Sequence, residues 1–559
     1  MKKTRIQKVD MISELPEPIL HHILSFLDFR QAAQTCVLSK NWERVWLTYP
    51  VVDIYNGLFY FPFHSKKEVF RRRRLRLLDS LEKSLRNRHH HCKDLVSMKK
   101  FNMVMEILED QEFAPFVDKC VSYSIRCNVK KLKLDFGLDD DDDDDSDDDD
   151  DDNDEGDREN RWYNLPQMVL CAKSLEVLKL GKCKLGLPIG SDVKLSYLRK
   201  LHLHEVDINN HAINNLFSGC PLIEEMIIGE CEGFESIELF GLSKINNILM
   251  FDNWDFNRLD AKLLNVSSLS ILDKGKFRPF DINVTDCTNL KNIELEGASI
   301  KDVSLYKLIS ELSLLESLYL GSCCKLKRVK ISSPSLKTLK ISNCYKVVEL
   351  MIDSPNLRHF TYDGGMISLC SNALALSNID LCFKLIKFDN QTQWYVKLAE
   401  LLTKFHSFSE TVKLQVSEDE DFNVPKELRE TLLSPLFSGK CFKLLIKETS
   451  QTFSIAKVVD DILSIAPHTK MISIEYGYFG GWSETSFEFS YKKPSVYKGE
   501  DSSCFKSHPI SCWQHCIEEL KLEIHNTDRI DIKGCSLDGA EFLEKIDGLC
   551  TLRSMMKLA

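Results

Sequence analysis

The sequence predicts an α/β fold, in which a small three-helix module precedes a leucine-rich-repeat solenoid with a curved parallel sheet and irregular carboxy-terminal repeats. Three observations predict this fold: apolar residues at helical spacing near the amino terminus, a leucine pattern that recurs through the middle of the chain, and strand-like fragments beyond residue 385. The chain has 559 residues, 43% of them hydrophobic, which is enough to form a large core.

Composition and charge exclude only a few classes of function. The formal net charge is −11, but residues 139–159 hold seventeen acidic residues against one base, so the rest of the chain is mildly basic. No apolar run reaches the ~18 residues that a membrane helix needs, and the start lacks the apolar region of a signal peptide. The 20 cysteines are scattered through a long chain, which favours reduced thiols in the cytoplasm or nucleus. We therefore expect no membrane partner and no nucleic-acid partner.

Three short apolar stripes predict the amino-terminal module. Two prolines suit the first turn of the first helix, where a missing N–H costs nothing. Ser39 is the expected N-cap of the third helix. Helices this short cannot bury so many large side chains among themselves, so they either close a core against the rest of the chain or leave a face open for another protein. The residues are, helix by helix, Pro16, Pro18, Ile19, Leu20, Ile23, Leu24 and Leu27; Ala33, Cys36 and Val37; and Trp42, Val45, Trp46 and Tyr49.

This stretch closely resembles the F-box in its plant form. The match includes "ISELPEPILHHILSFL" (12–27) and "LSKNWERVW" (38–46), and departs from the family at Asp28-Phe29, where Leu-Pro or Met-Pro is common. The resemblance implies binding to the Skp-type adaptor of cullin–RING ubiquitin ligases and, through it, to the cullin and RING subunits. The implied adaptor-contact residues are Leu15, Pro16, Ile19, Leu20, Ile23, Leu24, Leu27, Cys36, Val37, Leu38, Trp42 and Trp46, the last five partly in the module's own core.

A leucine-rich repeat, L-x-x-L-x-L-x-x-C/N, recurs nine times in the middle of the chain. Clear copies are "LEVLKLGKC" at Leu175 and "LESLYLGSC" at Leu315, and the spacings of 21 to 25 residues fall in the range of this repeat class. Each repeat should add one short strand, and repeats should stack because one alone cannot bury its apolar side. The first positions are 175, 198, 223, 245, 269, 290, 315, 336 and 357.

Two sets of residues follow from the repeat positions. Cys183, Cys231, Cys323 and Cys344 fall where the repeat uses Asn or Cys to satisfy backbone groups, so we interpret them as structural and expect no metal and no other cofactor. Residues between the strand leucines should face outward on the concave surface, a mixed polar surface suited to recognising a target protein. These residues are Lys179, His202, Glu294, Tyr319, Lys340 and Thr361.

The flanking segments carry weaker signals. A basic helical linker precedes the repeats. Its Arg71–Arg74 run fits a solvated helix face better than a nuclear-import signal. His89 to Cys92 are too close together for a tetrahedral zinc site. Near the end, residues 508–526 resemble the opening of the FBD domain of plant F-box/leucine-rich-repeat proteins, a better match than a metal site at Cys512 and its neighbours. The predicted divisions are 8–55 (F-box), 56–125 (linker and start of the solenoid), 126–385 (repeats), 386–500 (irregular repeats) and 501–559 (FBD-like).

The aspartate tract is predicted to be an insertion in one loop of the solenoid. "VKKLKLDFG" (129–137) reads as a repeat strand, and the next copy starts 46 residues later, about twice the period. Removing residues 138–160 leaves one ordinary repeat. Self-repulsion and the lack of apolar residues predict disorder. Alternatively, the tract folds over the basic segment 66–93 in a salt-sensitive contact.

Two hypotheses for the function remain. The resemblance implies a non-catalytic subunit that recognises substrates for an SCF-type (cullin–RING) ubiquitin ligase. The alternative is a leucine-rich-repeat interaction or sensor protein outside any ligase, including a receptor for a small molecule. No phosphate-binding loop, HExxH or GxSxG motif suggests an enzyme.

Overall fold

The structure of the chain is a computed structural model, and it forms two compact units that divide after Cys287. Each unit is considered by itself. Among the described residues, no helix is both long and apolar enough to cross a bilayer. The described residues are 12, 14–55, 78–79, 81–88, 97–105, 113–137, 162–188, 192–273, 280–284, 286–372, 378–384, 391–405, 411–418, 422–425, 441–448, 455–465, 471–478, 481–491, 517–524 and 528–533.

The amino-terminal module begins with α1 (Glu17–Leu24) and α2 (Phe29–Gln34) and continues through the 3-10 turn η1 (Thr35–Val37) to α3 (Lys40–Thr48). Pro18 lies in the first turn of α1, and Ser39 caps α3 by accepting a hydrogen bond from the Trp42 N–H at 3.2 Å. Both features were predicted. The structure also gives a reason for the departure from the family at residue 28, because the Asp28 carboxylate caps α2 in a capping box with Gln31.

The first unit contains a parallel sheet that starts directly after α3. Side chains alternate between buried and outward positions along each strand, as the leucine pattern predicts. The strands pair in chain order and in register, so that Leu132 lies beside Leu178, and Leu178 beside Leu201. In order they are β1 (Val51–Ile54), β2 (Lys100–Val104), β3 (Lys131–Asp135), β5 (Val177–Gly181), β7 (Lys200–His204), β8 (Glu225–Gly229), β10 (Asn247–Phe251) and β12 (Ser268–Leu272).

One predicted repeat start was wrong. The sequence placed the fifth first position at Leu269, but Leu269 pairs with Ile248, which is the fourth position of its own repeat. The copy therefore starts at the buried Val266. A valine in the first position hid it, since the search followed the leucines.

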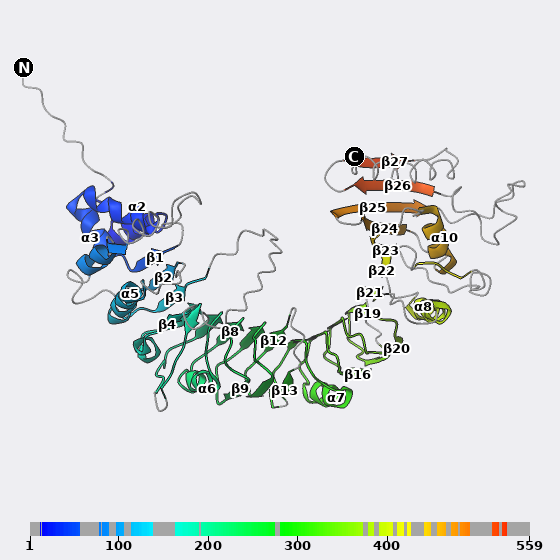
Figure 1. The fold of residues 1–559 in the computed structure, drawn as a ribbon, viewed down its shortest axis with the longest axis horizontal. Helices are drawn as coiled ribbons and strands as arrows, with labels where there is room; N and C mark the ends of the chain where they lie inside the picture. Colours follow the sequence, from blue (N-terminus) through cyan, green and yellow to red (C-terminus); the bar gives the residue numbers. More distant parts are fainter. Residues whose placement is uncertain are drawn as a thin grey trace, which may run out of the picture. The chain divides into compact units, whose positions relative to one another are not determined.

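The sequence predicted a single strand in each repeat, but several repeats of the first unit have a second one. Figure 1 shows β9 and α6 on the opposite side of this unit from β8. The longer of these strands alternate between buried and outward residues over five positions, but they lie beyond the nine positions of the leucine pattern. These elements are β9 (Ser236–Phe240), β11 (Arg258–Lys262) and β13 (Asp281–Asn283) in one small sheet, the pair β4 (Tyr163–Asn164) and β6 (Cys183–Lys184), and the helical segments α5 (Ala114–Arg126), η4 (Gln167–Cys171) and α6 (Asn210–Ser218).

The second unit continues the same repeat type and ends differently. Its parallel strands are β14 (Asn292–Glu296), β15 (Ser317–Gly321), β17 (Thr338–Ser342), β19 (His359–Gly364), β21 (Asn378–Lys384), β22 (Thr411–Glu418), β23 (Cys441–Glu448) and β24 (Met471–Tyr478). Then β25 (Gly481–Tyr491), β26 (Ile517–Ile524) and β27 (Asp528–Lys533) add antiparallel strands. The remaining elements are β16 (Arg328–Ser332), β18 (Glu349–Asp353), β20 (Ser368–Ser371), α7 (Asp302–Glu311), α8 (Gln391–Phe405) and α10 (Ile455–Ile465). The strand-like fragments beyond residue 385 that predicted irregular repeats, 411–416, 442–447 and 470–476, coincide with β22, β23 and β24.

The four repeat cysteines satisfy backbone groups, as predicted. Each thiol contacts a carbonyl oxygen at the end of its own or a neighbouring strand, for example Cys231 Sγ to Gly229 O at 3.2 Å and Cys323 Sγ to Gly321 O at 3.3 Å. Burial raises the pKa of Cys231 to about 12, which keeps it protonated at neutral pH. All four thiols donate to backbone carbonyl oxygens, and Cys344 Sγ also accepts from the Cys323 N–H.

The strand register locates the aspartate tract in one turn of the first unit. Asp135 pairs with Gly181, and Tyr163 pairs with Cys183. In the neighbouring repeat only Lys182 lies between these two partners, and Phe136 alone fills the matching position before Tyr163. The intervening residues are therefore an insertion at the turn after β3. This agrees with the predicted single-loop insertion. The tract itself, the basic segment up to residue 77, His89 to Cys92 and the residues around Cys512 lie outside the described residues.

Deleting residues 138–160 should leave the first unit folded and stabilise it by about 1–2 kcal/mol, because closing a shorter loop costs less conformational entropy. The unit stays folded because β3 and β5 already pair as neighbours, and Gly137 and two further residues would remain to bridge the turn. Chemical denaturation at low and high salt measures this. A stability loss that is present at low salt and disappears at high salt would instead support the contact with the basic segment.

Candidate functional site

Large apolar side chains are exposed on the amino-terminal module. The exposed fraction is 47% for Ile19 in α1, 87% for Val37 in η1 and 64% for Leu38 at the turn into α3. Two further residues join them, Phe26 at 76% and Ile12 at 55%. Exposed apolar side chains of this size, concentrated within about thirty residues, are typical of a protein-binding surface. We call these five residues the apolar face.

The structure divides the predicted adaptor-contact residues into two groups. Leu20 and Leu24 are 1% and 0% exposed, and Trp42 and Trp46 are 5% and 3% exposed, so these four form the core of the module. The prediction that Leu20 and Leu24 supply much of the contact is therefore corrected, because both point inward from α1. The residues that remain at least partly accessible are Leu15, Pro16, Ile19, Ile23, Leu27, Cys36, Val37 and Leu38.

Two residues of this face, Ile12 and Phe26, are missing from the predicted adaptor contacts, and Phe26 is the more exposed of them. It lies seven positions after Ile19 and three after Ile23, a spacing that places the three on one side of a helix. Its ring meets the His22 ring edge-on at a centroid distance of 4.9 Å. The signal was present in the sequence, but Phe26 sits just beyond the end of α1 and was not assigned to the stripe.

The core of the module is tied directly to the sheet. Trp46 meets the Phe29 ring edge-on at 5.1 Å, and the guanidinium carbon of Arg88 lies 4.7 Å from the centroid of the Trp46 ring. Arg88, which is 2% exposed, also donates to the Tyr49 carbonyl oxygen. Since β1 begins two residues after Tyr49, the module and the first strand share one packed region.

The outward side of the parallel sheet in the first unit, here called the open face, carries a row of predicted residues. Lys179 and His202 lie beside each other in register, as the repeat frame predicted. His202 Nε2 lies 2.9 Å from Glu225 Oε1. Burial, assisted by the nearby Lys179 charge, lowers the pKa of His202 below its usual value despite the Glu225 contact, so the ring is neutral at pH 7.

In the second unit the predicted residues also form a row. Glu294 pairs with Tyr319, Tyr319 with Lys340, and Lys340 with Thr361. The Lys340 ammonium lies 4.9 Å from the Tyr319 ring centroid, and the Ser342 hydroxyl lies 3.1 Å from the Tyr319 hydroxyl. These contacts hold the tyrosine ring across the sheet, where Gly321 leaves room for it. The placement agrees with the prediction; whether the row binds a target is a separate proposal.

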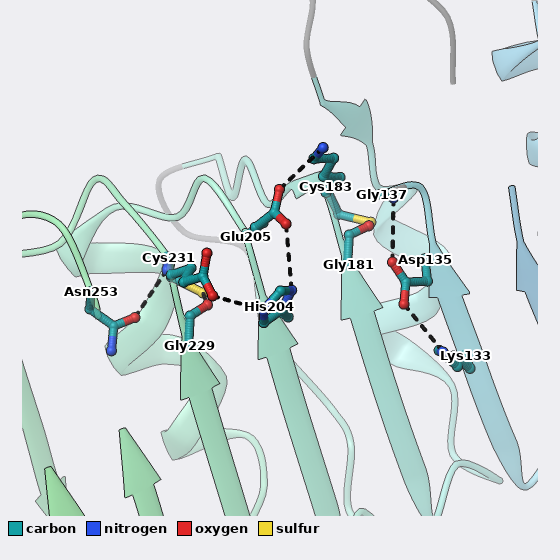
Figure 2. A network of polar contacts seen from close by, with 12 residues as sticks. Lys133, Asp135, Gly137, Gly181, Cys183, His204, Glu205, Gly229, Cys231 and Asn253 are labelled. Atoms are coloured by element: carbon teal, nitrogen blue, oxygen red, sulfur yellow. Dashed lines mark hydrogen bonds and ion pairs between the residues drawn. The ribbon is translucent and has the colours of Figure 1, made fainter. Parts of the chain in front are cut away.

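Figure 2 shows polar contacts along the edge of the first unit, where β3, β5, β7 and β8 end. His204 Nε2 lies 3.3 Å from Glu230 Oε1, and its Nδ1 lies 3.7 Å from Glu205 Oε1. In the described part of the chain, these three residues are the one group with metal-ligating side chains close together. Lys182 Nζ, however, lies 3.4 Å from Glu205 and already supplies a cation. The group is an exposed ion-pair network on the residues that turn the repeats.

Asn253→Ala should destabilise the first unit by about 1–3 kcal/mol, because the amide of Asn253 joins two repeats (Figure 2). Its Oδ1 accepts from the Cys231 N–H at 3.1 Å, and its Nδ2 donates to the Ile228 carbonyl at 3.0 Å. Denaturation monitored by circular dichroism measures the loss, with the exposed Ser196→Ala as the control. Equal stability of the two variants would show that the bridge contributes nothing.

Three protein families match parts of this chain. The F-box domain matches residues 12–51. The family described as FBD-associated F-box protein At5g56370, LRR repeats, matches residues 155–250. The family described as At1g61320/AtMIF1, LRR domain, matches residues 265–432. The first of them contains the apolar face, and the other two cover most of the repeats.

Curated relatives come from Arabidopsis thaliana. A protein named as F-box/FBD/LRR-repeat protein At4g13965 is 24% identical over 48% of this chain and 53% of its own length. One named as F-box protein At3g58860 is 24% identical over 53% of this chain and 57% of its own. One named as F-box/LRR-repeat protein At5g02700 is 25% identical over 40% and 39%. The chain thus spans about half or less of the length of these relatives, and each similarity is distant.

Proposed function

We propose that this chain, which matches the F-box domain and is similar to plant F-box/leucine-rich-repeat proteins, is the substrate-recognition subunit of an SCF-type (cullin–RING) ubiquitin ligase. The F-box binds a Skp-type adaptor and, through it, the cullin and RING subunits. The repeats bind a target protein. In this role the subunit acts without catalysis of its own: it holds the target near the ubiquitin-charged enzyme, which raises their effective concentration.

The apolar face carries this proposal. Exposing Val37 at 87%, Phe26 at 76% and Leu38 at 64% to water is unfavourable, at roughly 25 cal/mol per Å² of apolar surface, unless a partner covers them. The module's own core is complete without them, since Leu24 and Trp46 are already buried. The face is therefore available for a partner without unfolding the helices.

The junction between module and sheet supports the second half of the proposal. A recognition subunit must hold its target at a defined distance from the adaptor. A flexible linker between F-box and repeats would make that distance vary widely. Here β1 follows α3 with only Tyr49 and Pro50 between them, and Arg88 packs against Trp46. A short connection and packed contacts therefore join the F-box to the first strand.

Affinity purification of the tagged full chain under proteasome inhibition, followed by mass spectrometry, tests the proposal. We expect a Skp-type adaptor and a cullin among the co-purified proteins, together with targets whose abundance rises when the proteasome is blocked. Recovery of target proteins without any adaptor or cullin would favour a leucine-rich-repeat interaction protein outside a ligase.

A further inference from the structure

The open face of the first unit divides into a basic block and an apolar block. The outward residues of β2, β3, β5 and β7 include five lysines against one acidic residue, Asp135. On β8 and β10 the lysines stop: Glu225 and Asn247 follow Lys200 in register, and large apolar side chains take the central and last outward positions. We call Lys100, Lys131, Lys133, Lys179 and Lys200 the basic block, and Ile227, Leu249 and Phe251 the apolar block.

Some charges in the basic block are already neutralised by neighbours, and some are not. Lys100 pairs with Asp53 at 2.7 Å, Lys133 with Asp135 at 3.2 Å, and Lys200 with Glu225. Among the residues that the structure describes, Lys131 and Lys179 have no carboxylate within ion-pair distance. Two adjacent strands thus present uncompensated positive charge, which favours an anionic ligand.

The apolar block lies next to the basic block, with only His202 between Lys179 and Ile227 in the strand register. Ile227 lies directly between His202 and Leu249 in the strand register, and all three are half-buried. The Phe251 ring lies over Gly229, where a side chain on that residue would collide with it. The glycine therefore leaves room for the end of the aromatic ring above β8, which widens the apolar surface.

We propose that this open face binds an extended segment of a partner protein in which carboxylate side chains stand at one end and bulky apolar side chains at the other. The carboxylates lie over the basic block and the apolar side chains over the apolar block. This inference rests on the proposed function, since it specifies the chemistry of the target segment that the repeats recognise.

The dimensions fit a short peptide. Parallel strands are spaced ~4.8 Å apart, so the four steps from β3 to β10 cover ~19 Å, which an extended chain of about six residues spans. A nucleic acid would match the lysines, but its regular phosphate charge has no counterpart over Ile227 and Leu249. A protein segment can change from charged to apolar within that length, and so it fits both blocks.

Fluorescence anisotropy with labelled peptides of about twelve residues tests the proposal, using the full chain and its 138–160 deletion, because that tract carries the same charge as the probe. The probe has glutamates at one end and leucine and phenylalanine at the other, in both directions. We expect binding that weakens at least tenfold when glutamine replaces glutamate, and also when serine replaces the apolar residues. Binding by neither protein, or tighter binding of a single-stranded RNA of equal length, would overturn the proposal.

Charge reversal locates the site. Lys131→Glu combined with Lys179→Glu should weaken peptide binding at least tenfold at ~0.1 M salt, and by less at high salt. Lys244→Glu combined with Lys325→Glu makes the same change of charge at exposed turn lysines and should leave binding unchanged. Equal losses from both pairs would show that only overall charge matters, and would reject the site.

Adaptor binding, measured on the same protein preparations, separates this inference from the proposed function. The lysine variants should retain the adaptor fully, since neither lysine belongs to the apolar face. A wild-type chain that binds the adaptor but no probe peptide would refute the target chemistry alone. A chain that binds the peptide but no adaptor would refute the ligase role alone.

Discussion

Ile19→Asp, alone or with Val37→Asp, is expected to abolish co-purification of the Skp-type adaptor. Ile19 is 47% and Val37 87% exposed, so a charge at either position stays in contact with water and costs the folded chain little. In the complex, the same charge would be buried against an apolar partner, at a cost of several kcal/mol. A few buried anchors commonly carry such an interface, at ~2 kcal/mol or more each, and 1.4 kcal/mol is a tenfold change in affinity.

The matched control is Leu264→Asp, which places the same charge on a leucine that is 69% exposed in the repeats. It should bind the adaptor like the wild type. Circular dichroism of all three proteins should be the same, which would exclude unfolding as the cause. Full retention of the adaptor by Ile19→Asp would mean that the apolar face is not the docking surface.

Trp46→Ala is expected to destabilise the first unit by about 3–5 kcal/mol, the usual cost of truncating a buried tryptophan. Trp46 is 3% exposed and packs between Phe29 and Arg88. Its removal leaves a cavity and takes away the aromatic ring that the Arg88 guanidinium contacts. Because these contacts join the module to the start of the sheet, limited proteolysis should cleave within residues 14–55 first.

Trp254→Ala is the comparison for that variant, since Trp254 is 43% exposed in a repeat loop. It should lose less than ~1 kcal/mol. Denaturation midpoints of the two variants measure the difference. If Trp46→Ala were as stable as Trp254→Ala but lost the adaptor, Trp46 would be a contact residue and its placement in the core would be wrong.

The sequence predicted those parts of the fold that rest on a strict period or a local cap. The leucine positions gave the strands and their register because each apolar side chain has to meet its counterpart in the next repeat. Ser39 was identified as a cap because a hydroxyl before an apolar helix satisfies a free N–H. Placement of Lys179, His202 and Tyr319 on the outward side followed from the same alternation.

Other parts depend on tertiary packing, which a period does not encode. Leu20 and Ile19 are neighbours in one apolar stripe, yet one is 1% and the other 47% exposed, since α3 covers only one side of α1. The second strands of the repeats, such as β9 and β11, alternate over five residues but lie beyond the nine positions of the leucine pattern, so the search for that pattern did not find them. The role of Asp28 emerged only when Gln31 was seen to complete its capping box.

A calorimetric titration of the purified full chain with a purified plant Skp-type adaptor tests the central claim most directly. We predict one adaptor bound per chain, with a dissociation constant in the micromolar range or tighter and a negative heat-capacity change from the burial of the apolar face. Ile19→Asp should show no heat of binding in the same titration. Absence of binding by the wild-type chain would contradict the assignment of a ligase subunit.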